Sequence, residues 1–334
     1  MTNINKNNSI VAWRIYFAYI IAIFHILNSY GYGTSLYLAT DFFFIVSGFL
    51  LAKEAEENKY KSSIQMLISK VKKYYPHYIL SMIISYIVFR ILKSGPQLTI
   101  KEIMPELGLV QMIGLNLKKM VNVPTWYLSV LLICSYIIYF LITNYKKLFV
   151  EFLSPIFVIV VLTWFYRNYG YLNHSSLGDR TTGIYWNIPL MIGGSMMCIG
   201  VIIYYLIGAV NINVCGWKYR VIEIALLGSV PIIACIYRYS EFDFVILLMM
   251  AAGIMLSFAN KSSCNYNKYV RYFSKLSWPI YLNHNLFREI APYYIKHFSV
   301  KVMIVYLILI TIYSILTMFI VNKMTKRKEI IYNG

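Results

Sequence analysis

The sequence predicts an all-α integral membrane protein with about ten transmembrane helices and both termini in the cytoplasm. Three observations predict this fold class: the apolar composition, the lengths of the apolar runs and the placement of the basic residues. Of the 334 residues, 59% are hydrophobic and only 13% are charged, whereas about 25% are charged in a typical soluble domain. The mean hydropathy of +0.61 also indicates a surface that belongs in lipid.

The apolar runs set the number and the positions of the helices. A hydrocarbon core of about 30 Å requires roughly 20 mostly apolar residues per helix. Ten runs approach this length, although the second is short for a full span. We expect helices near residues 10–29, 38–52, 76–93, 126–144, 149–166, 186–210, 221–238, 242–259, 277–296 and 301–322.

The placement of the basic residues indicates the orientation in the membrane, and the lengths of the connections indicate the domain organisation. With the N-terminus inside, the cytoplasmic segments hold 20 of the 31 lysines and arginines, and this bias favours both termini inside. The connection 53–75 holds six lysines opposite apolar residues at helical spacing, so we expect an amphipathic helix on the inner membrane surface there. No connection is long enough to bury a core of its own. We therefore expect one domain over residues 1–334, with a helical core at about 10–322 and a basic cytoplasmic tail at 323–334.

The net charge of +18 could indicate nucleic-acid binding, but the basic residues are dispersed over loops between apolar runs. We therefore expect no nucleic-acid partner, and we attribute the charge to orientation and to attraction for membrane lipid head groups.

The five cysteines form no CxxC pair, so neither a zinc site nor a disulfide framework is indicated. The chemistry is expected within the helical bundle and its short loops, without a metal.

The first helix carries two polar residues that share a face. Arg14 and His25 are 11 positions apart, which corresponds to three turns plus about 20° and to a rise of about 16 Å. Arg14 is therefore expected near the cytoplasmic boundary, and His25 in the outer half of the membrane. Taken alone, the pair is as consistent with a structural role as with a functional one. In the structural role, the arginine extends to the head groups and the histidine satisfies a helix contact.

The second helix begins with Asp41 and continues as DFFFIVSGFLL, with Ser47 and Gly48 in its middle. Gly48 is expected to allow another helix to approach closely. Asp41 is a carboxylate at the external end of an apolar helix, where it could orient His25 or bind the acceptor of a reaction.

The run 277–296 holds a second polar cluster. His284 and Arg288 are four positions apart, so they share one face of a helix. Five polar side chains occur within seven positions, which suggests a polar, hydrated cavity. They are Asn283, His284, Asn285, Arg288 and Glu289.

In their order and spacing, these motifs resemble the acyltransferase-3 family of membrane acyltransferases. The resemblance covers roughly residues 12–322. Its elements are Arg14-x10-His25, DFFFIVSGFLL, a basic pair followed by a proline (Lys70, Lys73 and Pro76), TWYLSVLL and SWPIYLNH. The lysine pair is a departure, because it matches an Arg-x-x-Arg motif and lysine lacks the planar fork with which arginine binds a phosphate. WYLSVLL lacks the glutamate of the family's WSLSxE version, so we assign no acid there.

The resemblance implies a membrane-bound O-acyltransferase that takes an acyl group, usually acetyl, from cytoplasmic coenzyme A. It places the group on a hydroxyl of a glycan or a lipid-linked sugar. In the family, the histidine that His25 matches is held to be catalytic, and the basic pair is associated with the acyl donor. The richness in Ile, Lys, Asn and Tyr suggests an AT-rich bacterial genome, hence a bacterial plasma membrane and a cell-surface polysaccharide or its precursor as acceptor.

We therefore expect Arg14, Lys70 and Lys73 to bind the phosphates of acetyl-coenzyme A at the inner surface. His25 would act as the general base on the acceptor hydroxyl, and Arg14 and Asp41 are further catalytic candidates. Acetyl-coenzyme A is expected as a substrate, with no permanently bound cofactor. The candidates for substrate binding are Ser47, Tyr127, His284 and Arg288.

Two other classes of protein remain open. A transporter or flippase of a sugar intermediate would have the same helices, and an intramembrane His and Asp could relay protons. It should show inverted repeats with broken helices, which the sequence does not show. A structural or lipid-binding membrane protein would not need buried Arg, His and Asp.

The acceptor is expected to bind at the external connections 94–125 and 167–185. Most of the 32 tyrosines are expected in the aromatic belt at the membrane interface. The aromatic residues that could instead stack on a sugar are Tyr166, Tyr169, Tyr171, Tyr185 and Trp186.

Overall fold

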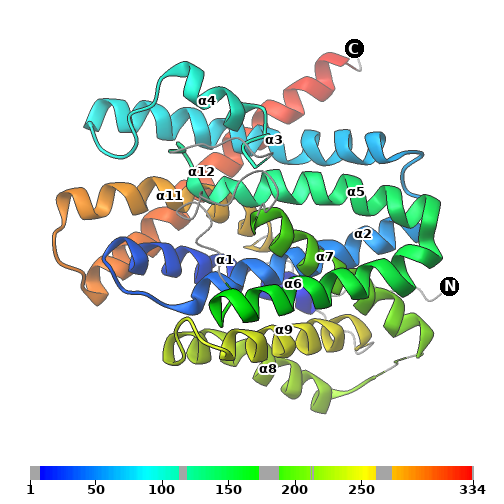
Figure 1. Ribbon diagram of the computed structural model, residues 1–334. Coiled ribbons are helices and arrows are strands. Elements are labelled where there is room, and N and C mark those ends of the chain that lie inside the picture. Colours follow the sequence, from blue (N-terminus) through cyan, green and yellow to red (C-terminus); the bar gives the residue numbers. More distant parts are fainter. Residues whose placement is uncertain are drawn as a thin grey trace.

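The computed structural model describes residues 8–112, 119–172, 188–210, 212, 214–260 and 273–332. Within these ranges every regular element is helical, apart from a single β-bridge between Val214 and Asn260. Figure 1 shows the long helices lying side by side in one bundle, with the short helix α4 on its outside, beside α3. The all-helical class predicted from the composition is confirmed.

The long helices of the bundle have 16 to 33 residues. The helices are α1 (Asn8–Ser29), α2 (Ala39–Glu56), α3 (Ser63–Leu92), α4 (Ile100–Leu107), α5 (Trp126–Leu148), α6 (Ser154–Tyr169), α7 (Ile188–Ala209), α8 (Trp217–Ile236), α9 (Phe242–Ala259), α11 (Ser277–Tyr294) and α12 (Val300–Tyr332). Three short turns, η1 (Ser35–Leu38), η2 (Val123–Thr125) and η3 (Phe149–Leu153), lead into α2, α5 and α6.

Eight helical segments of the described chain are long and apolar enough to cross a membrane, compared with the ten expected. One reason is that α5 and α6 belong to one helical stretch, Val123–Tyr169, which is interrupted by non-helical backbone at Tyr145 and by the π-helical turn η3. The other is that the polar residues in the middle of α11 lower its hydropathy below that of a simple span.

The basic segment after α2 does not form a separate surface helix. Instead α3 is a single helix of 30 residues that contains Pro76. The side chain of Ser62 caps its first turn by accepting a hydrogen bond from the backbone N–H of Gln65 at 3.2 Å. Lys70 and Lys73 therefore lie on the first half of the same helix that continues into the bundle.

The α2–α3 connection, residues 57–62, and the α3–α4 connection, residues 93–99, lie at opposite ends of the bundle (Figure 1). We call them the basic end and the α4 end. Helix α2 occupies the centre, since 83% of its most apolar window is buried. A Cβ atom at Gly48 would lie 2.0 Å from the carbonyl oxygen of Met197, so α2 and α7 touch through their backbones. The close packing predicted at Gly48 is confirmed, and it fixes the neighbouring Ser47.

Candidate active site

His25 on α1 and His284 on α11 lie side by side, with ring centroids 5.0 Å apart and planes inclined by 28°. Nδ1 of His284 is 3.2 Å from the carbonyl oxygen of Ile280. Because a carbonyl can only accept, Nδ1 carries the proton and Nε2 is unprotonated. Within the described residues this Nε2 is buried and has no hydrogen-bond partner. His25 remains partly exposed, so the pair offers imidazole nitrogens that can accept a proton.

Small residues and one tyrosine hold the two histidines together. Ala18 and Ala22 on α1 are fully buried in a cluster with Ile280 of α11. The hydroxyl of Tyr306 on α12 lies 3.2 Å from the carbonyl oxygen of Ala22 and 3.3 Å from that of His284. Helix α12 thereby fixes α1 and α11 at the level of the histidine pair.

Arg288 follows His284 by one helical turn, toward the α4 end. It interacts electrostatically with His25, and its Nη2 forms an ion pair with Glu289. Its Nε is buried and has no hydrogen-bond partner in the described part of the chain. A guanidinium in this place can stabilise negative charge that develops beside the histidines.

An aromatic path leads from His284 toward the basic end. The ring centroid of Tyr281 is 5.9 Å from that of His284 and 5.7 Å from that of Trp278. Trp278 lies 4.8 Å from Tyr74 of α3, and Nζ of Lys73 lies 5.2 Å from the Tyr74 ring centroid. We call Tyr74, Trp278 and Tyr281 the basic-end path. It joins a cation to the histidine pair.

Three of the predicted site residues lie beside the basic-end path. The ring of Tyr127 is 5.4 Å from that of Tyr281. Its hydroxyl is 3.5 Å from Oγ of Ser47, at the limit of a hydrogen bond. Arg14, which is partly buried, interacts electrostatically with Tyr127. The structure thus brings Arg14, Ser47 and Tyr127 together from α1, α2 and α5.

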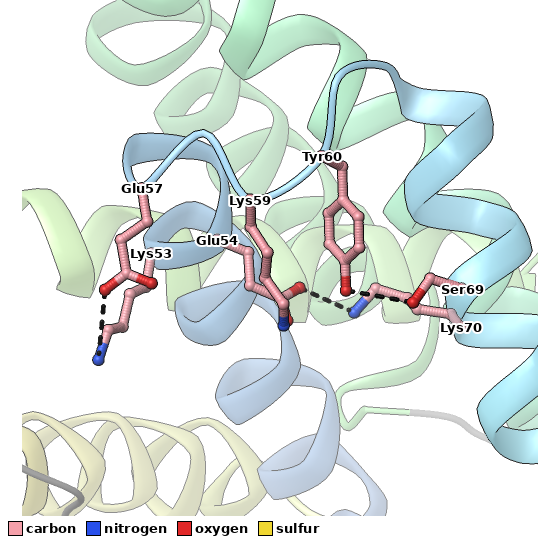
Figure 2. A network of polar contacts seen from close by, with 7 residues as sticks. All are labelled: Lys53, Glu54, Glu57, Lys59, Tyr60, Ser69 and Lys70. Carbon is pink, nitrogen blue, oxygen red and sulfur yellow. Dashed lines mark hydrogen bonds and ion pairs between the residues drawn. The ribbon is translucent and has the colours of Figure 1, made fainter.

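The two lysines of the basic motif differ in their surroundings. Nζ of Lys70 lies 3.3 Å from a carboxylate oxygen of Glu54, which also pairs with Lys59. Figure 2 shows this network at the α2–α3 connection. The side chain of Lys70 is only 14% exposed, whereas Lys73 is exposed and contacts the ring of Tyr74. The charge of Lys70 is therefore largely satisfied within the protein, and that of Lys73 is not.

Asp41, which was expected to orient His25 or to bind the acceptor, lies close to Tyr37. Asp41 is buried in the first turn of α2, where its charge acts on Tyr37. His25 contacts the ring of Phe24 at 4.9 Å and that of His284. The described contacts of His25 include no hydrogen bond to Asp41.

A second aromatic path leads from His25 toward the α4 end. The Phe24 ring lies 5.9 Å from Tyr37, which stacks on Tyr239 at 5.8 Å. Tyr171 contacts Tyr239 edge-on at 5.5 Å. We call Phe24, Tyr37, Tyr239 and Tyr171 the α4-end path. Of the aromatic residues expected to stack on a sugar, Tyr171 lies on it, Tyr166 and Tyr169 lie on the nearby α6, and Tyr185 and Trp186 fall outside the described residues.

The residues of the basic-end path were not among the site residues predicted from the sequence, although Trp278 and Tyr281 lie within SWPIYLNH. A signal existed, because Trp278, Tyr281 and His284 recur at three-residue spacing and so share one face of α11. Glu106 on α4 was also missed, and nothing in its sequence context singles it out. It is buried and accepts hydrogen bonds from the backbone N–H groups of Val121 (2.7 Å) and the following residue. Burial raises the pKa of Glu106 to about 7.

Within the described residues, no group of three or more His, Cys, Asp or Glu side chains could hold a metal ion. No curated protein and no solved structure matches the chain. A family model described as an acyltransferase domain matches residues 7–323, nearly the whole sequence, and includes the histidine pair and both aromatic paths. The chain therefore belongs to the acyltransferase-3 family and is a membrane acyltransferase.

Proposed function

We propose that the protein transfers an acetyl group from cytoplasmic acetyl-coenzyme A to a hydroxyl of a cell-surface polysaccharide or its lipid-linked precursor, with His25 as the general base. This proposal rests mainly on one observation. His25 lies where the two aromatic paths meet, one leading to the basic end of the bundle and the other to the α4 end. A donor and an acceptor that arrive from opposite ends would meet at this histidine.

The orientation forms part of the proposal. Ten crossings, with α11 among them and α5 and α6 counted separately, place both termini on the same side of a bacterial plasma membrane. The basic end faces the cytoplasm in this arrangement, as expected for exposed lysines such as Lys59, Lys73 and Lys146. Such lysines are also attracted to anionic lipid head groups.

The donor is polyanionic, so its phosphates require cations at the basic end. Lys73 is exposed there, and Arg14 is partly exposed beside Tyr127. Lys70 can join them only by weakening its pair with Glu54. The pantetheine arm would extend along the basic-end path, where Nε1 of Trp278 is a buried donor without a hydrogen-bond partner in the described chain. It could donate to an amide carbonyl of the arm.

In the transfer step, His25 removes the proton from the acceptor hydroxyl while the hydroxyl oxygen attacks the thioester carbonyl. The carbon–sulfur bond then breaks, and the coenzyme A thiolate recovers the proton from the imidazolium of His25. Nε2 of His284, which is unprotonated, can accept a hydrogen bond that positions the acceptor, and Arg288 can stabilise the oxyanion. The burial of His284 strengthens these electrostatic interactions.

Replacement of His25 tests this proposal. We expect His25→Ala and His25→Gln to lower acetyl transfer from labelled acetyl-coenzyme A in membranes by roughly 10² to 10⁴, because neither side chain can take the proton. Both variants should reach the membrane and keep coenzyme A binding, since the phosphates are held about 16 Å away. Wild-type transfer by His25→Gln would make His25 a packing residue. Movement of a sugar intermediate without consumption of acetyl-coenzyme A would favour a transporter.

A further inference from the structure

We infer that the surface around Tyr239 at the α4 end binds a pyranose ring of the acceptor glycan, next to the sugar that is acetylated. This inference rests on the proposed function, because it locates the acceptor of that reaction. It also narrows the acceptor to an oligosaccharide or a polymer.

Three separate connections of the chain converge beneath this surface. The backbone N–H of Tyr239, between α8 and α9, donates to Oγ of Ser35 in η1 at 2.8 Å. The backbone N–H of Leu172, just after α6, donates to a carboxylate oxygen of Asp243 at 3.2 Å. The hydroxyl of Tyr37 donates to the same carboxylate. A buried carboxylate with donors from two other segments makes this a built surface rather than a chance gathering of tyrosines.

Tyr239 is held in an unusual backbone conformation that presents its ring. Its φ is +46°, a region that residues other than Gly and Asn rarely adopt. A Cβ atom at Gly33 would lie 3.0 Å from the Tyr239 ring, so glycine there lets the ring rest against the backbone. Even so, Tyr239 is 43% exposed. A strained conformation that is fixed by its surroundings is typical of binding sites.

The chemistry of the surface fits a sugar. A pyranose has a face of C–H groups that packs on an aromatic ring and hydroxyl groups that donate to carboxylates. Tyr37 and Tyr171 flank Tyr239. Glu241, which is exposed, supplies a carboxylate two residues further on and accepts a hydrogen bond from Tyr166 at 3.4 Å. Rings of an interfacial aromatic belt alone would not need these carboxylates.

The position of the surface defines the size of the acceptor. Three ring contacts, each 4.9 to 5.9 Å between centroids, separate His25 from Tyr239. Because Phe24 and Tyr37 lie between the two rings along this path, we assign the sugar on Tyr239 to a neighbour, in the same glycan chain, of the sugar that presents its hydroxyl to His25.

Binding of glycan to purified protein in detergent tests the inference directly. The probe is the surface polysaccharide of the producing cells after removal of its ester groups by mild base. Tyr239→Asn removes the ring and keeps the left-handed backbone, which asparagine tolerates. We expect it to weaken polysaccharide binding by about tenfold, in the range of a lost stacking contact between rings. Tyr239→Phe should bind like the wild type.

Tyr237→Ala is the matched control, because Tyr237 lies in the same connection, is 42% exposed and stacks on Phe242 rather than on the α4-end path. It should bind polysaccharide normally, and in all variants the acetyl-coenzyme A concentration for half-maximal transfer should be unchanged. Failure of the wild type to bind the polysaccharide, or equal binding by Tyr239→Asn, would overturn the inference. If Tyr239 is required for binding but no acetyl transfer is found, the sugar site stands and the proposed reaction fails.

Discussion

The two aromatic paths that meet at His25 differ in the charges at their far ends. The basic-end path ends at cations, with Lys73 on the ring of Tyr74 and with Arg14 near its middle. Carboxylates lie beside the α4-end path, with Asp243 on the hydroxyl of Tyr37 and Glu241 two residues after Tyr239. Under the proposed function, rings of similar type would therefore serve different ligands. Cations select a polyanionic nucleotide, whereas carboxylates repel it and accept the hydroxyl groups of a neutral sugar.

The paths also differ in the segments that build them. The basic-end path lies on α3 and α11, whose packing fixes each ring. The α4-end path depends on the connections that flank α2, α6 and α9, although it begins on α1. Variants of the two paths should therefore have separable effects, with the donor affected at one end and the acceptor at the other.

After the His25 variants, the next largest effect is expected from replacement of the basic-motif lysines, Lys70 and Lys73. We expect Lys73→Ala to raise the acetyl-coenzyme A concentration for half-maximal transfer by about tenfold, as for loss of a charged hydrogen bond. Lys70→Ala should have a smaller effect, because Glu54 already satisfies Lys70 at 3.3 Å. Titration of labelled acetyl-coenzyme A in membranes measures both.

Lys73→Arg serves as the control and should preserve or improve donor binding, since arginine adds a planar fork. The acceptor concentration for half-maximal transfer should not change in any of these variants. A larger effect of Lys70→Ala than of Lys73→Ala would show that the pair with Glu54 opens when the donor binds. Unchanged donor titrations in both would separate the lysines from the donor.

A smaller effect is expected from Glu106, which holds the segment before α5 by accepting two backbone hydrogen bonds. Burial raises its pKa to about 7, above the ordinary value of about 4.3 for Glu. The folded protein therefore binds the proton more tightly than the unfolded chain. This contribution to stability is complete below the unfolded pKa and is lost as pH rises through 7. We expect Glu106→Gln to reduce the fall in melting temperature between pH 5 and pH 8 by about 2–4 °C.

Glu102→Gln on the same helix is the matched control, because Glu102 is exposed and its hydrogen bonds with Thr99 hold its pKa below the ordinary value. It should leave the melting difference between pH 5 and pH 8 unchanged. Equal melting differences in the wild type and Glu106→Gln would show that Glu106 does not titrate in this range.

The sequence predicted the positions of most helices because bilayer thickness sets the length of an apolar run. The range 242–259 coincides with α9, and 277–296 nearly coincides with α11. The continuous α3 was not predicted, because the cap at Ser62 lies within a polar stretch and Pro76 resembles a helix start. Helix α4 was not predicted either, because it is too short and too polar to form an apolar run of membrane-spanning length.

The residues of the candidate site were predicted better than their contacts. His25 and His284 were both selected as polar groups in apolar helices, but their pairing depends on the packing of α1 against α11, segments far apart in sequence. The pair of Lys70 with Glu54 depends on the fold of the α2–α3 connection. Tyr239 could not be selected at all, since its role follows from a backbone conformation and from Gly33 beneath its ring.

We propose that donor and acceptor reach His25 from opposite ends of the bundle. The most direct test of this proposal presents the two substrates on opposite faces of a membrane. Sealed right-side-out vesicles can be loaded with labelled acetyl-coenzyme A, and the base-treated polysaccharide added outside. The account predicts label on the polysaccharide in these vesicles, and none when both substrates are outside sealed vesicles. Equal transfer with both substrates on the outer face would contradict the account, because the donor would then reach His25 from the same end as the acceptor.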